Sequence, residues 1–170
     1  MAIHATARSQ WAQARLLGWL KGLSLTGTPA VFAAIEPGRS AQASPSVRVG
    51  FEELPPLPMG RFSATQTAMR MSLLVICDLF WPHPDNVAPV DLALYQHLTV
   101  SDELREAMQF LELSFLDYTA PAAPVAVAGT IIRIQRAQTQ RIPVDKQADH
   151  LRVRTKAVAE WIGRFDDHFA

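Results

Sequence analysis

The segment from Met69 to Pro82 constrains the fold more than any other part of the chain, because it is strongly apolar and has no helical stripe. It is too short to cross a lipid bilayer, and it carries Arg70 and Asp78. It is rich in Leu, Val, Ile, Phe and Trp and ends at a proline, as is typical of a strand buried on most of both sides. One face would hold Met69, Met71, Leu73, Val75, Cys77, Leu79 and Trp81, and the other Arg70, Ser72, Leu74, Ile76, Asp78 and Phe80. We therefore expect the middle strand of a β-sheet here.

Length and composition predict a single domain over residues 1–170. A chain of 170 residues, of which 49% are hydrophobic, can bury a sufficient core without further support. The 16 basic and 16 acidic residues cancel, so no global charge draws the protein to nucleic acid or to an anionic membrane. The only cysteine, Cys77, lies in the apolar segment, which argues against a disulfide framework or a cysteine-based metal site and suits the cytosol. No signal peptide is expected, because the N-terminal segment lacks an uninterrupted apolar stretch and a small-residue cleavage site.

Helical and strand patterns lie on both sides of this segment. Residues Thr6 to Leu25 carry apolar side chains at three- and four-residue steps, which predicts a helix. Its other side is basic, so it could lie on a membrane, but packing on a sheet is favoured because few charges are involved. Two more helices are predicted at Pro89–Leu98 and Leu104–Leu111, with Ser101 as the N-cap of the second. Strands are predicted at Pro29–Ile35, Ser46–Phe51, Leu111–Tyr118 and Val125–Gln135, the last with an optional extension to Arg141.

Two loop arms are predicted, at residues 36–45 and 52–67. The second contains Pro55, Pro56 and Pro58, and so many prolines are not expected within regular structure. Long ordered loops are usually functional or held by a partner. Both arms are therefore predicted to be interface segments that are mobile in a free subunit and ordered in an assembly.

The segment His150–Phe165 fits two periods. A helical stripe would consist of Leu151, Thr155, Val158, Ile162 and Phe165. A strand would place Leu151, Val153, Thr155, Ala157, Ala159 and Trp161 on one face, opposite Arg152, Arg154, Lys156 and Glu160. Periodicity alone does not decide between the two.

No residue pattern predicts catalysis, a cofactor or a metal. The five histidines lack paired ligand spacing, the glycines form no phosphate loop, and no serine lies in a Gly-x-Ser-x-Gly turn. The tripeptide from His83 to Asp85 is interpreted as a polar turn rather than a metal site. Asp78 and Asp117 lie near strand ends, where hydrogen-bonded carboxylates are favoured over an active site. A small cytosolic enzyme or ligand-binding domain that uses these two acids is the alternative.

One charge feature stands out, a basic strip formed by Arg133, Arg136, Arg141, Arg152, Arg154, Lys156 and Arg164. Spread over two strands, these residues could form a solvated face or could meet an acidic partner or DNA.

Several elements together resemble a known family in their order. An N-terminal helix is followed by a strand in Gly-Thr-Pro-Ala-Val-Phe (27–32), a strand in Pro-Ser-Val-Arg-Val (45–49) and a long arm. The central strand, helices, Leu-Asp-Tyr (116–118) and a closing strand with Arg-Val-Arg (152–154) come next. This layout resembles the tail-terminator proteins of long-tailed bacteriophages. The resemblance implies a single α/β (α+β) domain with a mixed, largely antiparallel sheet covered by helices, with long loop arms.

The resemblance also implies a function without catalysis. Family members assemble in the host cytoplasm and close the virion tail tube as homohexameric rings, which contact the tail tube protein and a head–tail connector or neck protein but no membrane. It favours the strand interpretation of residues 150–165. Arg133, Arg152, Arg154 and Lys156 would line a channel for DNA without sequence specificity, or pair with acids of a neighbouring subunit such as Glu52, Glu53, Asp102 or Glu103. Pro55, Pro56 and Pro58 would belong to an interface arm. Another neck or head-completion protein is the alternative within the same assembly.

Overall fold

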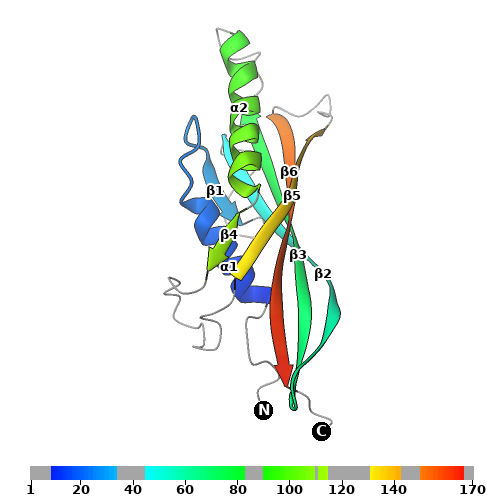
Figure 1. Ribbon diagram of the computed structural model, residues 1–170. Helices are drawn as coiled ribbons and strands as arrows, with labels where there is room; N and C mark the ends of the chain where they lie inside the picture. Colours follow the sequence, from blue (N-terminus) through cyan, green and yellow to red (C-terminus); the bar gives the residue numbers. More distant parts are fainter. Residues whose placement is uncertain are drawn as a thin grey trace.

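The computed structural model describes residues 9–33, 45–82, 90–109, 111–114, 131–142 and 150–166, which form two helices and one six-stranded sheet (Figure 1). The helices are α1 (Ser9–Lys21) and α2 (Val90–Met108). The strands are β1 (Ala30–Ala33), β2 (Ser46–Ser63), β3 (Gln66–Pro82), β4 (Glu112–Ser114), β5 (Ile131–Ile142) and β6 (His150–Asp166). Neither helix of these residues combines the length and the hydrophobicity that crossing a bilayer requires.

The sheet has the strand order β1-β2-β3-β6-β5-β4, and only the β1–β2 pair is parallel among these strands. The strand β3 pairs with β2 on one side and with β6 on the other, from Gln66 opposite Asp166 to Pro82 opposite His150. The predicted α+β fold with a mixed, largely antiparallel sheet is confirmed. The segment from His150 is a strand, so the strand interpretation is correct and the helical one is wrong.

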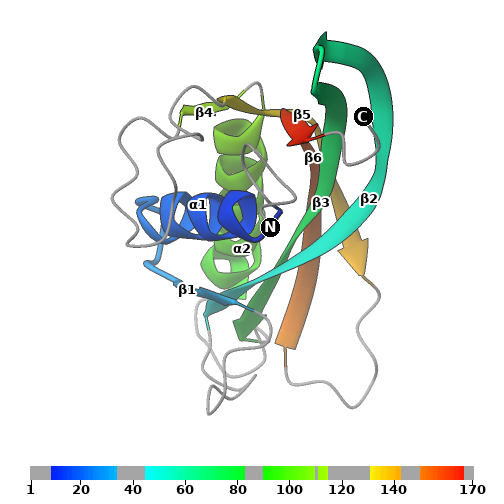
Figure 2. The same cartoon turned by 90° about the horizontal axis from the view of Figure 1, so that it is seen from below.

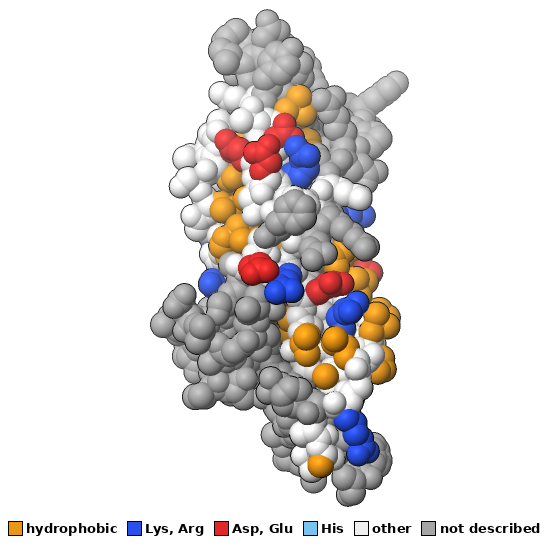
Figure 3. Space-filling model, in the orientation of Figure 1, with side chains coloured by type: hydrophobic (Ala, Val, Ile, Leu, Met, Phe, Trp, Pro, Cys, Tyr) orange, Lys and Arg blue, Asp and Glu red, His pale blue; other side chains and the backbone are white. Residues whose placement is uncertain are grey.

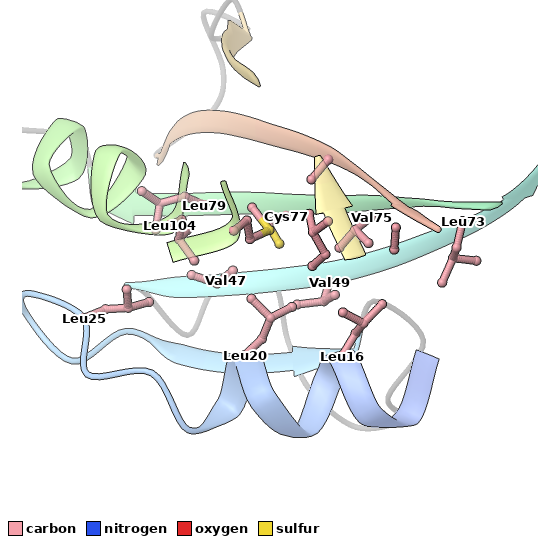
Figure 4. Packing of buried hydrophobic residues seen from close by; sticks show 14 of the residues in the cluster. Leu16, Leu20, Leu25, Val47, Val49, Leu73, Val75, Cys77, Leu79 and Leu104 are labelled. Atoms are coloured by element: carbon pink, nitrogen blue, oxygen red, sulfur yellow. The ribbon is translucent and has the colours of Figure 1, made fainter. Parts of the chain in front are cut away.

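Both helices lie on the same side of the curled sheet (Figure 2). Alternate residues of the strands are buried against them, as Figure 4 shows for Val47 and Val49 of β2 and Leu79 of β3. The helices contribute Ala12, Leu16, Leu20, Val100, Leu104 and Met108 to this core. The prediction that the central strand is buried on most of both sides is correct only in part, because Leu73 to Leu79 are fully buried on the helix-facing side but half-buried on the other.

The other side of the sheet is partly exposed, and we call it the open face. It is formed by Arg48, Gly50, Glu52 and Leu54 of β2, by the even-numbered residues from Arg70 to Phe80 of β3, and by the even-numbered residues from Arg152 to Ile162 of β6. These residues are polar at both ends of β3 and apolar in its middle, so the sequence pattern of that strand was read correctly although its burial was predicted only in part.

The two helices predicted at 89–98 and 104–111 are one continuous helix, α2. No proline or glycine interrupts residues 90–108, and Val100, Leu104 and Met108 continue the apolar stripe at four-residue steps. Ser101 therefore lies inside the helix and is buried, not placed as an N-cap. The helix predicted at 6–25 is confirmed as α1 with shorter bounds.

The strand β2 continues through the segment that was predicted to be irregular. It pairs with β3 up to Ser63 opposite Gln66, with irregularities between Leu54 and Leu57, between Pro58 and Gly60, and between Arg61 and Ser63. Pro55 and Pro56 fall within the first of these irregularities. Among the described residues, β1 pairs only with Ser46 to Val49, so the rest of β2 is an edge, where a missing N–H group costs no bond to a further strand. Pro55 and Pro56 therefore coincide with an irregularity in the pairing of β2 with β3 but do not end β2.

Three strands extend together beyond the helices, at the bottom of Figure 1. We call this part of the sheet the ribbon and define it as residues 55–63, 66–70 and 162–166. The interface arm predicted at 52–67 is thus a strand pair and not a loop. The other predicted arm, residues 36–45, lies outside the described residues apart from Pro45.

The turn after α1 depends on Gly27. Its φ is +72°, and a Cβ atom there would lie 2.8 Å from Cη2 of Trp81, which is buried in the core. The substitution Gly27→Ala should lower the free energy of unfolding by about 2 kcal/mol, because it combines a left-handed backbone with a side-chain clash. Urea denaturation measures this effect.

Gly18→Ala is the matched control. Gly18 lies in α1, and a Cβ atom there would meet nothing within 4 Å. Alanine should stabilise the helix by about 0.5–1 kcal/mol at this position. Equal effects of the two substitutions would contradict the role of Gly27.

Candidate assembly surface

Rows of side chains cross the open face from strand to strand, because residues paired across neighbouring strands point to the same side. The rows are Arg48–Asp78–Arg154, then Gly50–Ile76–Lys156, then Glu52–Leu74–Val158, then Leu54–Ser72–Glu160, and in the ribbon Leu57–Arg70–Ile162. The first row, near β1, consists of three charged residues, whereas each of the following rows combines one charged residue with apolar or small polar ones.

Asp78 joins the two arginines of β6. Its Oδ1 accepts a hydrogen bond from Nε of Arg154 at 2.7 Å, and its Oδ2 accepts from Nη2 of Arg154 at 2.9 Å and from Nη2 of Arg152 at 2.6 Å. Only 13% of the Asp78 side chain is exposed, so these charge-assisted bonds form in a partly dry environment. They fix both guanidinium groups on the open face.

The protonation states of this cluster follow from burial and hydrogen bonding. Burial tends to raise the pKa of Asp78, but the hydrogen bonds from Arg154 and Arg152 outweigh it and hold the pKa below its ordinary value. The hydrogen bond to Asp78 in turn raises the pKa of Arg154. Burial, with a contribution from the Asp78 charge, raises the pKa of the Cys77 thiol to about 12. At neutral pH the side chain of Asp78 is thus charged and the thiol of Cys77 is uncharged.

Arg48 is held by aromatic rings. Its guanidinium carbon lies 4.8 Å from the ring centroid of Phe80 and 5.9 Å from that of Phe32. Arg152 lies 5.4 Å from the Phe80 ring, on which both cations can be stabilised. Although Arg48 lies opposite Asp78, that carboxylate accepts its side-chain hydrogen bonds from β6. In the described part of the chain, Nε of Arg48 is buried without a hydrogen-bond partner.

The predicted basic strip is only partly brought together. Arg152, Arg154 and Lys156 lie on one face of β6. Arg133 is opposite Glu160, six residues along β6 from Arg154, or about 20 Å away. Its Nε pairs with Oε1 of Glu112 at 2.9 Å in an exposed ion pair. The side chains of Arg136, Arg141 and Arg164 lie outside the described part of the structure.

Exposed hydrophobic side chains gather on the ribbon. Leu57, Met59 and Ile162 are 56%, 48% and 52% exposed, and Leu57 and Ile162 lie on either side of Arg70 in one row. Figure 3 shows hydrophobic side chains over this lower part of the molecule. The half-buried residues Leu54, Leu74, Ile76 and Val158 extend this surface toward the charged end of the open face. We call the open-face residues Leu54, Leu57, Leu74, Ile76, Val158 and Ile162 the apolar band. Exposed apolar surface is typical of interaction sites, although Arg70 and Ser72 lie between members of this band.

Pro55, Pro56 and Pro58 are exposed on the outer strand of the ribbon. Arg48 was not among the predicted site residues, although the alternation of residues 46–51 places it on the face opposite that of Val47 and Val49.

No set of three His, Cys, Asp or Glu side chains among the described residues is placed to hold a metal ion. His83, Asp85 and Asp117 lie outside these residues.

No model of a known protein family matches the chain, and no curated protein matches it.

Proposed function

We propose that this chain is a structural subunit that assembles with copies of itself through the ribbon. Following the resemblance in layout, we further propose that it is a tail terminator of a long-tailed phage. In that role it would assemble in the host cytoplasm, and six copies would close the tail tube as a ring in the virion. The ring would contact the tail tube protein on one side and a head–tail connector or neck protein on the other.

The observation that carries this proposal is the exposure of Leu57, Met59 and Ile162 together on a ribbon that extends beyond the helices. Burying one large aliphatic side chain completely contributes about 1.5–3 kcal/mol, so covering three half-exposed ones favours association. The outer edge of the ribbon carries Pro55, Pro56 and Pro58, and prolines there oppose the addition of another strand. The contact would therefore be made by side chains and not by extension of the sheet.

The basic strip contributes less to this function than its number of residues indicates. Arg152 and Arg154 both form ion pairs with Asp78, and Arg133 forms one with Glu112. Contacts between such a ring and DNA passing through it would be weak, salt-sensitive and independent of sequence.

Native mass spectrometry and negative-stain electron microscopy of the purified protein test the proposal. We expect a six-fold species and ring-shaped particles. The double substitution Leu57→Ser and Ile162→Ser should abolish them without unfolding the subunit, because both side chains are exposed. Ala14→Ser, on the exposed side of α1, is the control and should leave the rings intact. A protein that stays monomeric at its highest soluble concentration would contradict assembly, and rings that survive the double substitution would contradict the ribbon contact.

A further inference from the structure

The open face of β2 carries two opposite charges without a charged partner in the described part of the chain. Arg48 is held by the rings of Phe32 and Phe80, while Asp78 bonds to the arginines of β6. Glu52 is exposed, and its row across the sheet continues with the apolar Leu74. The two residues are four positions apart on the same side of one strand, or about 13 Å.

The surface between these charges is open and apolar. Gly50 lies midway, and a Cβ atom at this position would meet nothing within 4 Å. Its neighbour in the row is the half-buried Ile76. Another protein surface can therefore approach the backbone of β2 closely at Gly50.

We infer that a second copy of this chain packs its open face against this one, with the two β2 strands antiparallel about a two-fold axis near Gly50. Reversing the strand exchanges the positions of Arg48 and Glu52, so the patch is complementary to itself, as an isologous contact requires. Arg48 of each copy then pairs with Glu52 of the other. Stacked sheets lie about 10 Å apart, a gap that an arginine and a glutamate side chain span together.

A second copy fits this surface better than an unrelated protein, because its reversed β2 strand places an opposite charge against both Arg48 and Glu52 at the observed spacing. Lys156 lies in the same row as Gly50, two strands away, so the two-fold axis would bring it toward Lys156 of the other copy. The crossing of about 30° between packed sheets moves these two like charges apart. This contact differs from the one proposed for the ribbon, and it holds whether or not the copies also form a ring.

Charge exchange tests the pairing. Arg48→Glu and Glu52→Arg each place like charges together twice in the symmetric pair, so each should weaken self-association by about tenfold or more. The double variant Arg48→Glu/Glu52→Arg should restore the homodimer. An equimolar mixture of the two single variants should form a mixed dimer, which native mass spectrometry resolves by mass. Glu53→Arg is the control, because this exposed residue lies opposite Leu73 on the other face of β2. Single variants that associate like the parent protein, or a mixture without mixed dimers, would overturn the inference.

Cross-linking tests the symmetry and does not depend on changing Arg48. In the variant Gly50→Cys the two introduced thiols lie near the axis, so a short bismaleimide should join two copies. Cys77 is buried and does not compete. Gly18→Cys, on the exposed side of α1, should cross-link far less. Rings without a cross-link at position 50 would overturn this inference but agree with the proposed function. Cross-linked dimers without rings would support this inference and contradict the proposed ring.

Discussion

Replacing Asp78 by asparagine should lower the free energy of unfolding by about 2–3 kcal/mol at pH 7. The substitution preserves the shape of the side chain and removes the carboxylate that Arg152 and Arg154 share. Those two side chains remain 37% and 28% exposed, so water replaces part of the lost interaction, and the cost falls below that of a fully buried pair. Urea denaturation followed by circular dichroism measures the difference.

The stability difference between the parent protein and Asp78→Asn should depend on pH. Because the pKa of Asp78 is lower in the folded protein than in the unfolded chain, its contribution is fully present above the unfolded pKa of about 4. The contribution is lost as the pH falls through the lower, folded pKa. The stability difference between the parent protein and Asp78→Asn should therefore persist from pH 7 to about pH 5 and shrink below pH 4. Glu106→Gln, an exposed acid on α2, should show almost no difference at either pH, and a constant deficit for Asp78→Asn down to pH 2 would contradict the role of the charge.

Replacing Leu104 by alanine should have an even larger effect, about 3 kcal/mol. This side chain is 1% exposed and connects α2 to the sheet near Leu79, as Figure 4 shows. The truncation would leave a cavity in a core that cannot fully collapse, because the strands beneath it are fixed by hydrogen bonds on both sides. Chemical denaturation gives the magnitude, and amide exchange should show increased opening of α2.

Leu57→Ala is the matched control, since it makes the same chemical change at a side chain that is 56% exposed. It should alter the stability of the subunit by no more than about 0.5 kcal/mol while weakening association through the ribbon. If both substitutions cost the same free energy of unfolding, the assignment of Leu104 to the core and Leu57 to a surface would be wrong.

The parts of the fold that were predicted correctly depend on local information. The central strand β3 was recognisable because its residues are strongly apolar over a length that no helix stripe explains. The sequence did not reveal which face of β3 is fully buried and which is half-buried, because that depends on where α1 and α2 lie. The extension of β2 was missed for a related reason. Pro55 and Pro56 exclude an inner strand, but only the short length of β1 reveals that they lie at an edge.

On the candidate surface, too, features that depend on local sequence were predicted, and features that depend on strand register were not. The outward direction of Arg152, Arg154 and Lys156 follows from alternation along β6 and was predicted. Their partner was not predictable, because the pairing of Asp78 with Arg154 depends on the register between strands far apart in the sequence. The exposed surface formed by Leu57 and Ile162 depends on that register as well.

The pairing of β3 with β6 also determines how the chain can fold. This pairing joins Pro82 to His150 and Gln66 to Asp166, so two neighbouring strands in the middle of the sheet come from segments that lie far apart in the sequence. Closing such large loops costs conformational entropy before any contact compensates for it, and folding slows as sequence separation grows. During synthesis β3 has one unpaired edge until β6 has left the ribosome, and that edge belongs to a long, strongly apolar strand. We therefore expect an aggregation-prone interval during synthesis, in which the unpaired edge of β3 can associate with other chains.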